Sequence, residues 1–239
     1  MAKKKDICEI CGKELTYLSP SDARKTLQCH FCGKKFDVNT YCENGHYICD
    51  ECHAKDAKEI TIEYLKKTTL TDPFRMADEI MQHPKFRIYG PEHHFLVPSV
   101  ILTALKNSKV KKPNGKEVDF NDVLEGVKRG ATIPGGYCGF FGTCGSGIGT
   151  GITVSIFTEA NPSKDKERTL ANKMTARVLT YVADDLEHCC KRSLKYAICE
   201  ALDFLNEHFK IEPKLDFSPE ACIFSEKNPK CEQAKCLFN

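Results

Sequence analysis

Apolar positions recur every three or four residues along most of the chain beyond residue 53, and this spacing predicts a mostly α-helical body. The pattern predicts helices over 54–67 and 93–107, then a long helix over 163–188 and another over 189–209. Alternating β-branched residues favour a short strand only in segment 152–157. The fold class that follows is helical almost throughout.

Residues with capping side chains mark the starts of several of these helices. Asp72 precedes Pro73, an order typical of an N-cap followed by the first helical turn. Asp119 is suited to cap the next helix, and Ser163 is suited to cap the long one. The predicted domains are residues 1–67, a metal-binding module with its exit helix, and residues 68–239, a helical cysteine-rich domain.

The chain of 239 residues carries a formal net charge of +2, and its basic and acidic residues are interspersed along the whole length. This distribution lacks the basic stripe that nucleic-acid-binding proteins use. The start has no apolar signal-peptide core, and no apolar run is long enough to span a bilayer. We therefore expect a soluble cytoplasmic protein, with neither nucleic acid nor a membrane as its partner.

The sequence contains fifteen cysteines, and those near the N-terminus have the spacing of metal ligands. A Cys-x-x-Cys turn followed by glycine directs two thiolates to one ion, and eight ligands suffice for two tetrahedral zinc ions. Because this segment is poor in apolar residues, zinc would supply much of its folding energy. The predicted ligands of two Zn²⁺ ions are Cys8, Cys11, Cys29, Cys32, Cys42, His46, Cys49 and Cys52.

The six ligands from Cys29 to Cys52 resemble the first six ligands of a RING finger. A RING finger ends with a further Cys-x-x-Cys pair downstream, whereas the remaining pair here lies upstream, so ubiquitin-ligase activity is not implied. The alternative to a cross-brace is sequential pairing of the ligands Cys8–Cys32 and Cys42–Cys52. Zinc folds of this type present surfaces to other molecules, and we expect this module to bind a protein partner. The cross-brace would place Cys29, Cys32, Cys49 and Cys52 on one ion and Cys8, Cys11, Cys42 and His46 on the other.

Residues 135–151, GGYCGFFGTCGSGIGTG, hold eight of the fifteen glycines of the chain. Glycine loses more backbone entropy on folding than any other residue, so this density requires a structural reason. The glycine spacing departs from the dinucleotide fingerprint and no strand precedes it, which disfavours a nucleotide site. In the second half of the stretch, glycines four residues apart would give a helix a smooth face for close packing.

In the first half of the same stretch, glycine follows each cysteine and leaves the approach to its sulfur open. If a helix begins near Gly145, Cys144 lies at its positive end, where a thiolate is stabilised. We predict Cys138 and Cys144 as catalytic thiols that form a redox disulfide, bind a substrate sulfur or ligate metal. His93 and His94 are candidate acid–base partners, and close packing alone is the competing interpretation of the glycines.

The segment after residue 211 is irregular and proline-bearing, yet it keeps three cysteines. Their spacing suits a metal cluster whose fourth thiolate comes from elsewhere, and the adjacent Cys189 and Cys190 are candidates for that ligand. Both begin a predicted helix and precede two basic residues, a setting that lowers a thiol pKa. A zinc ion on the same residues and unligated thiols are the alternatives. The predicted ligands of a [4Fe–4S] cluster are Cys190, Cys222, Cys231 and Cys236.

The glycine-rich stretch, the CCKR sequence at 189–192 and the cysteine-bearing tail together resemble an uncharacterised prokaryotic domain family of unknown function. The similarity runs from about residue 70 to residue 239. That family occurs largely in anaerobic archaea and bacteria, sometimes joined to methyltransferase or radical-chemistry domains. The resemblance implies that the cysteines act as a set and that the N-terminal module is a variable attachment.

These features predict a cytosolic metalloprotein, a thiol- or iron–sulfur-dependent enzyme of redox or sulfur-handling chemistry with a partner-binding zinc module. An iron–sulfur hydro-lyase, in which a cluster iron acts as a Lewis acid, is a variant of this hypothesis. The alternative is a non-catalytic zinc-binding adaptor or regulator whose glycine-rich loop binds a small ligand or a partner. Selective reaction of Cys138 and Cys144 with alkylating reagents would favour the enzyme.

Overall fold

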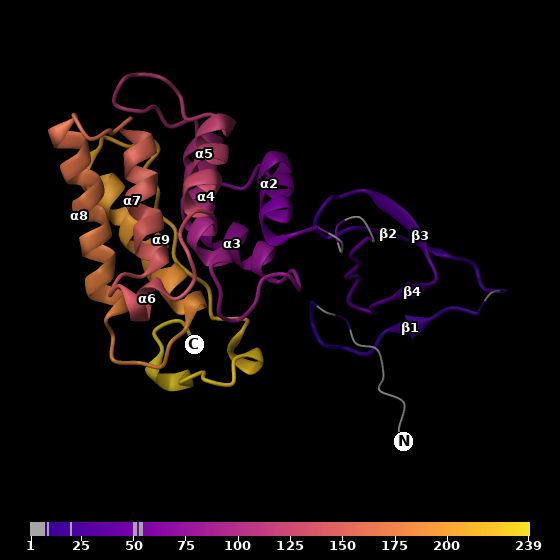
Figure 1. Cartoon of the computed structure of the whole chain (residues 1–239). Coiled ribbons are helices and arrows are strands. Elements are labelled where there is room, and N and C mark those ends of the chain that lie inside the picture. Colours follow the sequence, from indigo (N-terminus) through magenta and orange to yellow (C-terminus); the bar gives the residue numbers. More distant parts are fainter. Residues whose placement is uncertain (1–7, 9, 20, 50–51, 53–54) are drawn as a thin grey trace.

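The computed structural model describes residues 8, 10–19, 21–49, 52 and 55–239. A small N-terminal module precedes a helical body, and an irregular tail lies at one end of that body near α6 (Figure 1). The predicted mostly α fold is confirmed. The helices are α2 (Ala57–Lys67), α3 (Pro73–Met81), α4 (Glu92–Asn107), α5 (Phe120–Gly130), α6 (Tyr137–Phe140), α7 (Gly145–Phe157), α8 (Asp165–Val182) and α9 (Cys190–His208), and the tail carries the 3-10 turns η1 (Ser225–Lys227) and η2 (Gln233–Lys235).

Helix α4 is the centre of the body. Its residues are apolar on nearly every side, and they are buried from Glu92 to Leu105 because α5, α7 and α9 all pack against this helix. Pro98 lies inside α4, as the sequence predicts. Each fully buried Leu or Ile side chain of this core contributes about 1.5–3 kcal/mol relative to an exposed one. The position of α4 therefore fixes the positions of the helices around it.

Helix α7 approaches two neighbours closely through its glycines. A Cβ atom added to Gly149 would lie 2.9 Å from the carbonyl oxygen of His94 on α4, and one added to Gly151 would collide with Thr175 on α8. The predicted packing role of these glycines is confirmed. The predicted strand over 152–157 is wrong, because those residues continue α7, whose packing on both sides overrides their β propensity.

Two of the predicted helix caps are present. The Asp72 carboxylate accepts hydrogen bonds from the backbone N–H groups of Phe74 at 2.9 Å and Arg75 at 3.3 Å, and Pro73 follows in the first turn of α3. Asp119 begins α5 with a reciprocal capping box, in which its third following residue returns the hydrogen bond. Each cap of this kind is worth about 1 kcal/mol.

The long helix α8 is shorter than the sequence predicts. It begins at Asp165 with Lys164 at the N-cap position, so Ser163 is not its cap. It ends at Val182 rather than at 188, because the chain turns at Asp185, whose φ is 55°. The residues after this turn form a loop that leads into α9. Helix α2 begins at Ala57, and the earlier part of its predicted span includes residue 54, which lies outside the described residues.

The N-terminal module is built around two short antiparallel strand pairs. Strand β1 (Thr16–Tyr17) pairs with β4 (Thr40–Tyr41), and β2 (Lys25–Gln28) forms a hairpin with β3 (Lys35–Val38). Two-stranded pairs of this length are marginal by themselves in water, so the module needs further support.

Helix α2 and three polar contacts attach this module to the body. On α2, Tyr64 and Leu65 join the core of the body, whereas Ile60 packs against the buried cysteines of the module. The polar contacts all end on backbone carbonyl oxygens of the module. They are Lys67 Nζ to Cys32 at 2.9 Å, His83 Nε2 to Cys52 at 3.2 Å and Lys227 Nζ to Ile10 at 2.8 Å.

No helix among the described residues combines the length and the apolar character that crossing a membrane requires.

Candidate functional site

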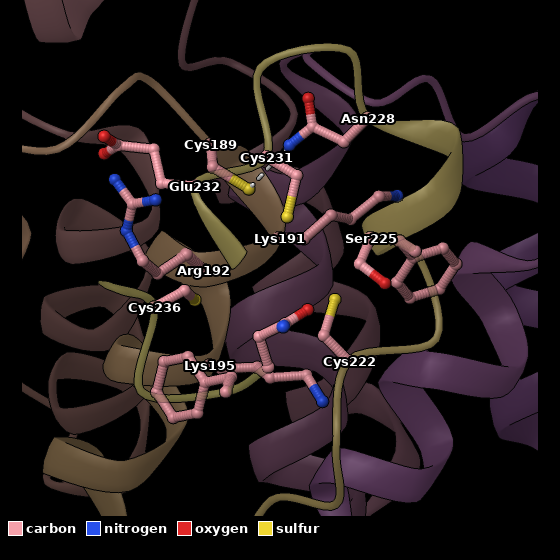
Figure 2. A pocket seen from close by; sticks show the side chains of 13 residues that line it. Cys189, Lys191, Arg192, Lys195, Cys222, Ser225, Asn228, Cys231, Glu232 and Cys236 are labelled. Atoms are coloured by element: carbon pink, nitrogen blue, oxygen red, sulfur yellow. Dashed lines mark hydrogen bonds between the residues drawn. The ribbon is translucent and has the colours of Figure 1, made fainter. Parts of the chain in front are cut away.

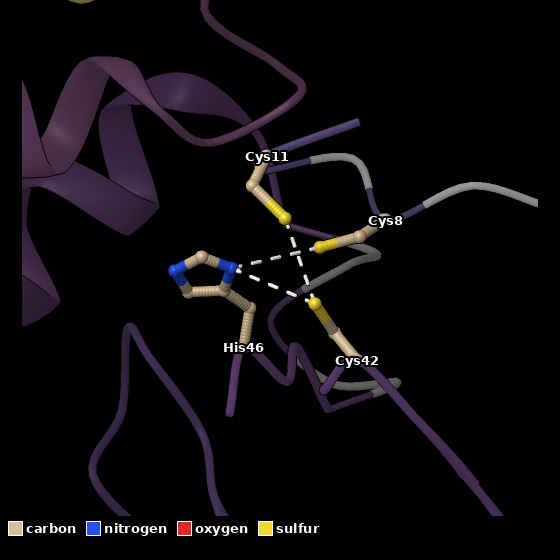
Figure 3. Close-up of side chains that lie close together, drawn as sticks. All are labelled: Cys8, Cys11, Cys42 and His46. Atoms are coloured by element: carbon tan, nitrogen blue, oxygen red, sulfur yellow. Dashed lines mark hydrogen bonds between the residues drawn. The ribbon is translucent and has the colours of Figure 1, made fainter. Parts of the chain in front are cut away.

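The eight predicted N-terminal ligands gather into two groups, and each group can hold a metal ion. The grouping follows the predicted cross-brace and differs from sequential pairing. The first group is drawn in Figure 3, where the three sulfurs and the imidazole face one another. The groups are Cys8, Cys11, Cys42 and His46, and Cys29, Cys32, Cys49 and Cys52.

Distances within the first group are those of a tetrahedral metal site. His46 Nδ1 lies 3.8 Å from Cys8 Sγ and 3.9 Å from Cys42 Sγ. The usual zinc bond lengths place tetrahedral nitrogen and sulfur ligands about 3.6 Å apart, and two sulfurs about 3.8 Å apart. Burial acts to raise the pKa of Cys11, but hydrogen bonding by the Lys13 backbone and by His46 outweighs it and lowers this pKa to about 6. A thiolate at neutral pH is the form that binds metal.

Glycine shapes two of the three Cys-x-x-Cys turns of the module. Gly12 and Gly33 have φ values of 73° and 69°, a region in which residues with side chains are strained. In each turn the glycine N–H donates to the carbonyl oxygen of the first cysteine, at 2.7 Å to Cys8 and 2.9 Å to Cys29. The turn therefore directs both sulfurs to the same side, as the sequence predicts.

A second gathering of cysteines surrounds a small cavity of about 20 Å³ between the start of α9 and the tail (Figure 2). We call it the tail cavity. One of its cysteines is the N-cap residue of α9, and the other three come from the tail. Its cysteines and basic residues are Cys189, Cys222, Cys231, Cys236, Lys191, Arg192 and Lys195.

Hydrogen bonds hold the tail around this cavity. The Cys222 N–H donates to the Phe238 carbonyl oxygen at 2.6 Å, which joins the two ends of the tail. The buried Asn228 accepts a hydrogen bond from the Tyr89 hydroxyl and donates to Cys189 Sγ at 3.6 Å. The irregular tail is thus fixed by specific contacts, although it has little regular secondary structure.

Two of the basic side chains at the tail cavity have carboxylate partners. Arg192 Nε donates to Asp184 at 2.7 Å, and Lys195 Nζ donates to Asp78 at 3.1 Å. Lys195 also donates to the carbonyl oxygen of Glu220 at 3.0 Å. These pairs position α9 against both the loop before it and the tail after it.

Lys191 differs from its neighbours. It is 1% exposed, and its Nζ has no hydrogen-bond acceptor among the described residues. The ammonium lies 4.7 Å from the centre of the Phe224 ring, a cation–π contact. Burial lowers the pKa of Lys191 to about 8. The carboxylates of Glu92 and Asp78 act on this ammonium through space and raise its pKa, but neither accepts a hydrogen bond from it. A further negative charge close to the ammonium would stabilise it.

The sulfurs of the tail cavity are spaced more widely than those of the N-terminal module. Within the described part of the chain, only the two N-terminal groups bring three or more ligand atoms within 4.8 Å of one another. A single tetrahedral zinc ion requires sulfurs about 3.8 Å apart. The four cysteines of the tail cavity therefore do not fit one ion as they stand.

Cys138 and Cys144 line a neighbouring open cavity of about 230 Å³, together with Cys190 and His188. His188 Nε2 lies 3.5 Å from Cys190 Sγ and 3.9 Å from Cys138 Sγ. Cys189 belongs to the walls of both cavities, so the two are adjacent. The structure thus brings both predicted catalytic thiols to one accessible space.

Helix starts lie at this open cavity. Cys144 is the N-cap residue of α7, which begins at Gly145 as the sequence predicts. Cys190 is the first residue of α9. Burial raises the pKa of Cys190 to about 11, which corrects the expectation that the helix end and the following basic residues would lower it.

Neither of the two predicted acid–base histidines forms a hydrogen bond with a thiol in the described part of the chain, although the His94 ring packs against Gly145 beside Cys144. His93 is fully buried, and its Nδ1 lies 2.9 Å from the carbonyl oxygen of Gly90. His94 lines the open cavity, but its Nδ1 lies 3.1 Å from the carbonyl oxygen of Ile133. The histidine that contacts the thiols is His188.

The structure differs from the sequence prediction at the start of α9. Cys222, Cys231 and Cys236 do share a cavity, but the fourth cysteine there is Cys189, whereas Cys190 lines the open cavity. Sequence reasoning also missed His188, although it lies two residues before Cys190 in the chain. That proximity is the signal that could have identified it.

Comparison with known proteins places the chain in a family. No curated protein and no solved structure matches it. Residues 61–239 match the family of unknown function DUF5714, a range that begins within α2 and covers both cysteine-lined cavities. The N-terminal metal-binding groups lie outside the matched residues. The chain belongs to the family of unknown function DUF5714.

Proposed function

We propose that this protein is a metal-dependent enzyme of redox or sulfur-handling chemistry, in which an iron–sulfur cluster lies next to a reactive thiol site. The two N-terminal groups bind zinc and stabilise the module. The open cavity admits the substrate to Cys138 and Cys144. The cluster occupies the tail cavity, with Cys189, Cys222, Cys231 and Cys236 as its ligands.

The buried ammonium of Lys191 is the observation that carries this proposal. An unpaired charge in the protein interior costs several kcal/mol, so an anionic group in the cavity would offset that cost. A cluster with four thiolate ligands is such a group. A zinc ion with four thiolates is also anionic, but the sulfurs at the tail cavity are too widely spaced for it. The thiolate ligands of an iron–sulfur core are farther apart, which suits this spacing better. Because the cavity is only about 20 Å³, the surrounding side chains must move outward to admit the core.

The relation between the two cavities supports a catalytic role. Because Cys189 and Arg192 line both, a molecule bound near Cys138 would lie beside a cluster ligand. An iron–sulfur cluster supplies one-electron transfer or, with an open iron, Lewis-acid chemistry. The prediction that the N-terminal module recruits a protein partner stays a prediction.

Anaerobic purification of the full chain, followed by iron, acid-labile sulfide and zinc determination, tests the cluster. We expect four iron and four sulfide ions per chain, the composition of a [4Fe–4S] cluster, with absorption near 400 nm. Cys189→Ala and Cys222→Ala should each lose most of the iron. Cys190→Ala should retain it, as should Cys199→Ala, a matched control on α9 outside both cavities.

Three results would contradict the proposal. One is a colourless protein that carries zinc alone. A second is iron that persists in the Cys189→Ala and Cys222→Ala variants but disappears in Cys190→Ala. Loss of iron in all variants, the Cys199→Ala control included, would also count against ligation in the tail cavity.

A further inference from the structure

The open cavity holds metal-binding side chains that the proposed cluster does not use. His188 lies in the loop between α8 and α9, with its Nε2 near the sulfurs of Cys138 and Cys190 at 3.9 Å and 3.5 Å. Tetrahedral zinc places nitrogen and sulfur ligands about 3.6 Å apart. The same kind of distance, 3.8 Å and 3.9 Å, occurs around His46 in the N-terminal module.

We propose that Cys138, His188 and Cys190 bind a third zinc-class divalent ion, separate from the tail cavity. Two thiolates and one imidazole are a ligand set that catalytic zinc sites use, with the fourth position open to water or substrate. The open cavity of about 230 Å³ around these residues gives that fourth position access to solvent. Binding of the ion does not depend on the proposed function. A role of the ion in the reaction does rest on that proposal.

Ligand geometry here is more open than in the N-terminal groups. The three ligand atoms do not all lie within 4.8 Å of one another, a spacing that only the N-terminal groups reach among the described residues. Cys138 is exposed and lies in the four-residue helix α6. An exposed side chain can adopt another staggered rotamer, and a change of this kind at Cys138 is needed to bring the three ligand atoms together.

Contacts beyond the ligands hold the histidine in place. The His188 ring stacks on Tyr89, with ring centres 5.4 Å apart and an angle of 22° between the planes. The Tyr89 hydroxyl donates to the buried Asn228, so the stacking surface is itself fixed. One residue earlier, the Glu187 N–H donates to Glu232 at 2.9 Å. Such outer contacts orient metal-binding histidines and raise their affinity for the ion.

The experiment measures zinc and iron separately in the full chain. Protein is loaded with Zn²⁺ under anaerobic reducing conditions, freed of weakly bound metal and analysed for both elements. We expect three zinc ions per chain in the wild type and two in Cys138→Ser, His188→Ala and Cys190→Ser, with most of the iron retained. The matched controls Cys199→Ser and His208→Ala, on the body of α9, should keep three.

Two zinc ions in the wild type would overturn the inference. So would a third ion that survives all three ligand substitutions, or one lost only with Cys189→Ala, which would assign it to the tail cavity. Far-ultraviolet circular dichroism identifies variants that fail to fold. The wild type then supplies an independent test: Zn²⁺ should slow alkylation of the exposed Cys138 at least tenfold in peptide-resolved mass spectrometry, and an unchanged rate would contradict zinc binding there.

The two proposals fail independently. Absence of iron with three bound zinc ions would remove the cluster and leave the third metal site. A full complement of iron with two zinc ions would do the reverse.

Discussion

Lys191 and His93 are buried basic side chains that influence each other across the core. Each has a nitrogen without a hydrogen-bond partner among the described residues, and each is at most 1% exposed. Burial lowers the pKa of His93 well below its ordinary value, and the charge of Lys191 lowers it further. In this pair Lys191 therefore carries the positive charge, while His93 stays neutral.

Replacing Lys191 tests the charge of whatever occupies the tail cavity. Lys191→Met removes a positive charge beside the proposed cluster, and the reduction potential should fall by roughly 50 mV or more. Potentiometric titration of the iron-loaded protein measures this shift. Lys230→Met, which removes a 57% exposed lysine side chain, should change the potential much less because solvent screens its charge. Equal potentials in wild type and Lys191→Met would contradict an anionic cluster there.

Titration of His93 should make stability depend on pH. Below about pH 6.5 the unfolded chain binds a proton at this histidine that the native state excludes, so the free energy of unfolding falls as the pH falls. The slope per proton is about 1.4 kcal/mol per pH unit. The difference between wild type and His93→Phe in urea unfolding should therefore shift in favour of the variant between pH 6 and pH 5. Parallel stability curves would show that His93 binds its proton equally well in both states.

Helix α7 carries both a thiol of the open cavity and glycines that pack against two neighbouring helices. Its N-cap residue, Cys144, lies at the open cavity, while Gly149 and Gly151 bring the next two turns against α4 and α8. At Gly149 the nearest neighbour is the His94 carbonyl oxygen, and at Gly151 it is the Thr175 side chain, so both positions leave little room for a shift of the helix. The position of Cys144 thus depends on glycines that lie away from the cavity.

The substitution Gly149→Ala tests this dependence. Its Cβ atom would lie 2.9 Å from the His94 carbonyl oxygen, and we expect a loss of about 1–3 kcal/mol in the free energy of unfolding. The matched control is Gly139→Ala in α6, whose Cβ would meet nothing within 4 Å and should leave stability within about 0.5 kcal/mol. Urea unfolding followed by circular dichroism compares the two. Similar losses in both variants would point to a local backbone effect instead.

The sequence predicts helices and caps well where neighbouring side chains determine them. It predicts helix ends less well, because contacts from distant parts of the chain determine those. The caps at Asp72 and Asp119 and the glycine face of α7 follow from side chains close in sequence. The strand predicted at 152–157 failed because a helix already fixed by tertiary contacts extends through it. The end of α8 at Val182 also failed, since it depends on a turn whose stability comes from other parts of the chain.

The same helix ends explain what the sequence could not show of the site. The apolar pattern predicts His188 at the end of a long helix. In the structure the helix ends at Val182, and His188 lies in the following loop, where its side chain approaches Cys138. Cys189 has extended backbone, with φ −146° and ψ 106°, whereas Cys190 is helical. Side chains on either side of such a junction point in different directions. Which of the two joins the tail thus depends on the residue at which α9 begins.

Across the whole molecule, the N-terminal module depends on both its metal groups and the body. Its antiparallel strand pairs are short, and its buried clusters consist mainly of the ligand cysteines with a few apolar residues. The contacts from Lys67, His83 and Lys227 all end on carbonyl oxygens near the ligands Cys32, Cys52 and Cys11. Loss of metal should therefore loosen the module first and weaken its attachment to α2 afterwards.

Chelation followed by hydrogen–deuterium exchange tests this order. Removing the N-terminal metal ions should abolish protection in residues 10–49 and reduce it in α2, while α4 and α7 keep theirs because their core does not involve the module. Restoring Zn²⁺ should restore the protection. Cooperative loss of protection throughout the body would show instead that the whole chain folds as a single unit with its metals.

A single peptide bond joins the residues that face the two cavities, and this adjacency has a thermodynamic consequence. An ion on Cys190 would restrict the first turn of α9, and the same restriction would limit the positions open to the sulfur of Cys189. The first group to bind orders that turn and loses the conformational entropy. The second group then binds to a turn that is already ordered, so occupation of either cavity favours occupation of the other. Such coupling is reciprocal: whatever factor the zinc ion adds to cluster retention, the cluster adds to zinc affinity.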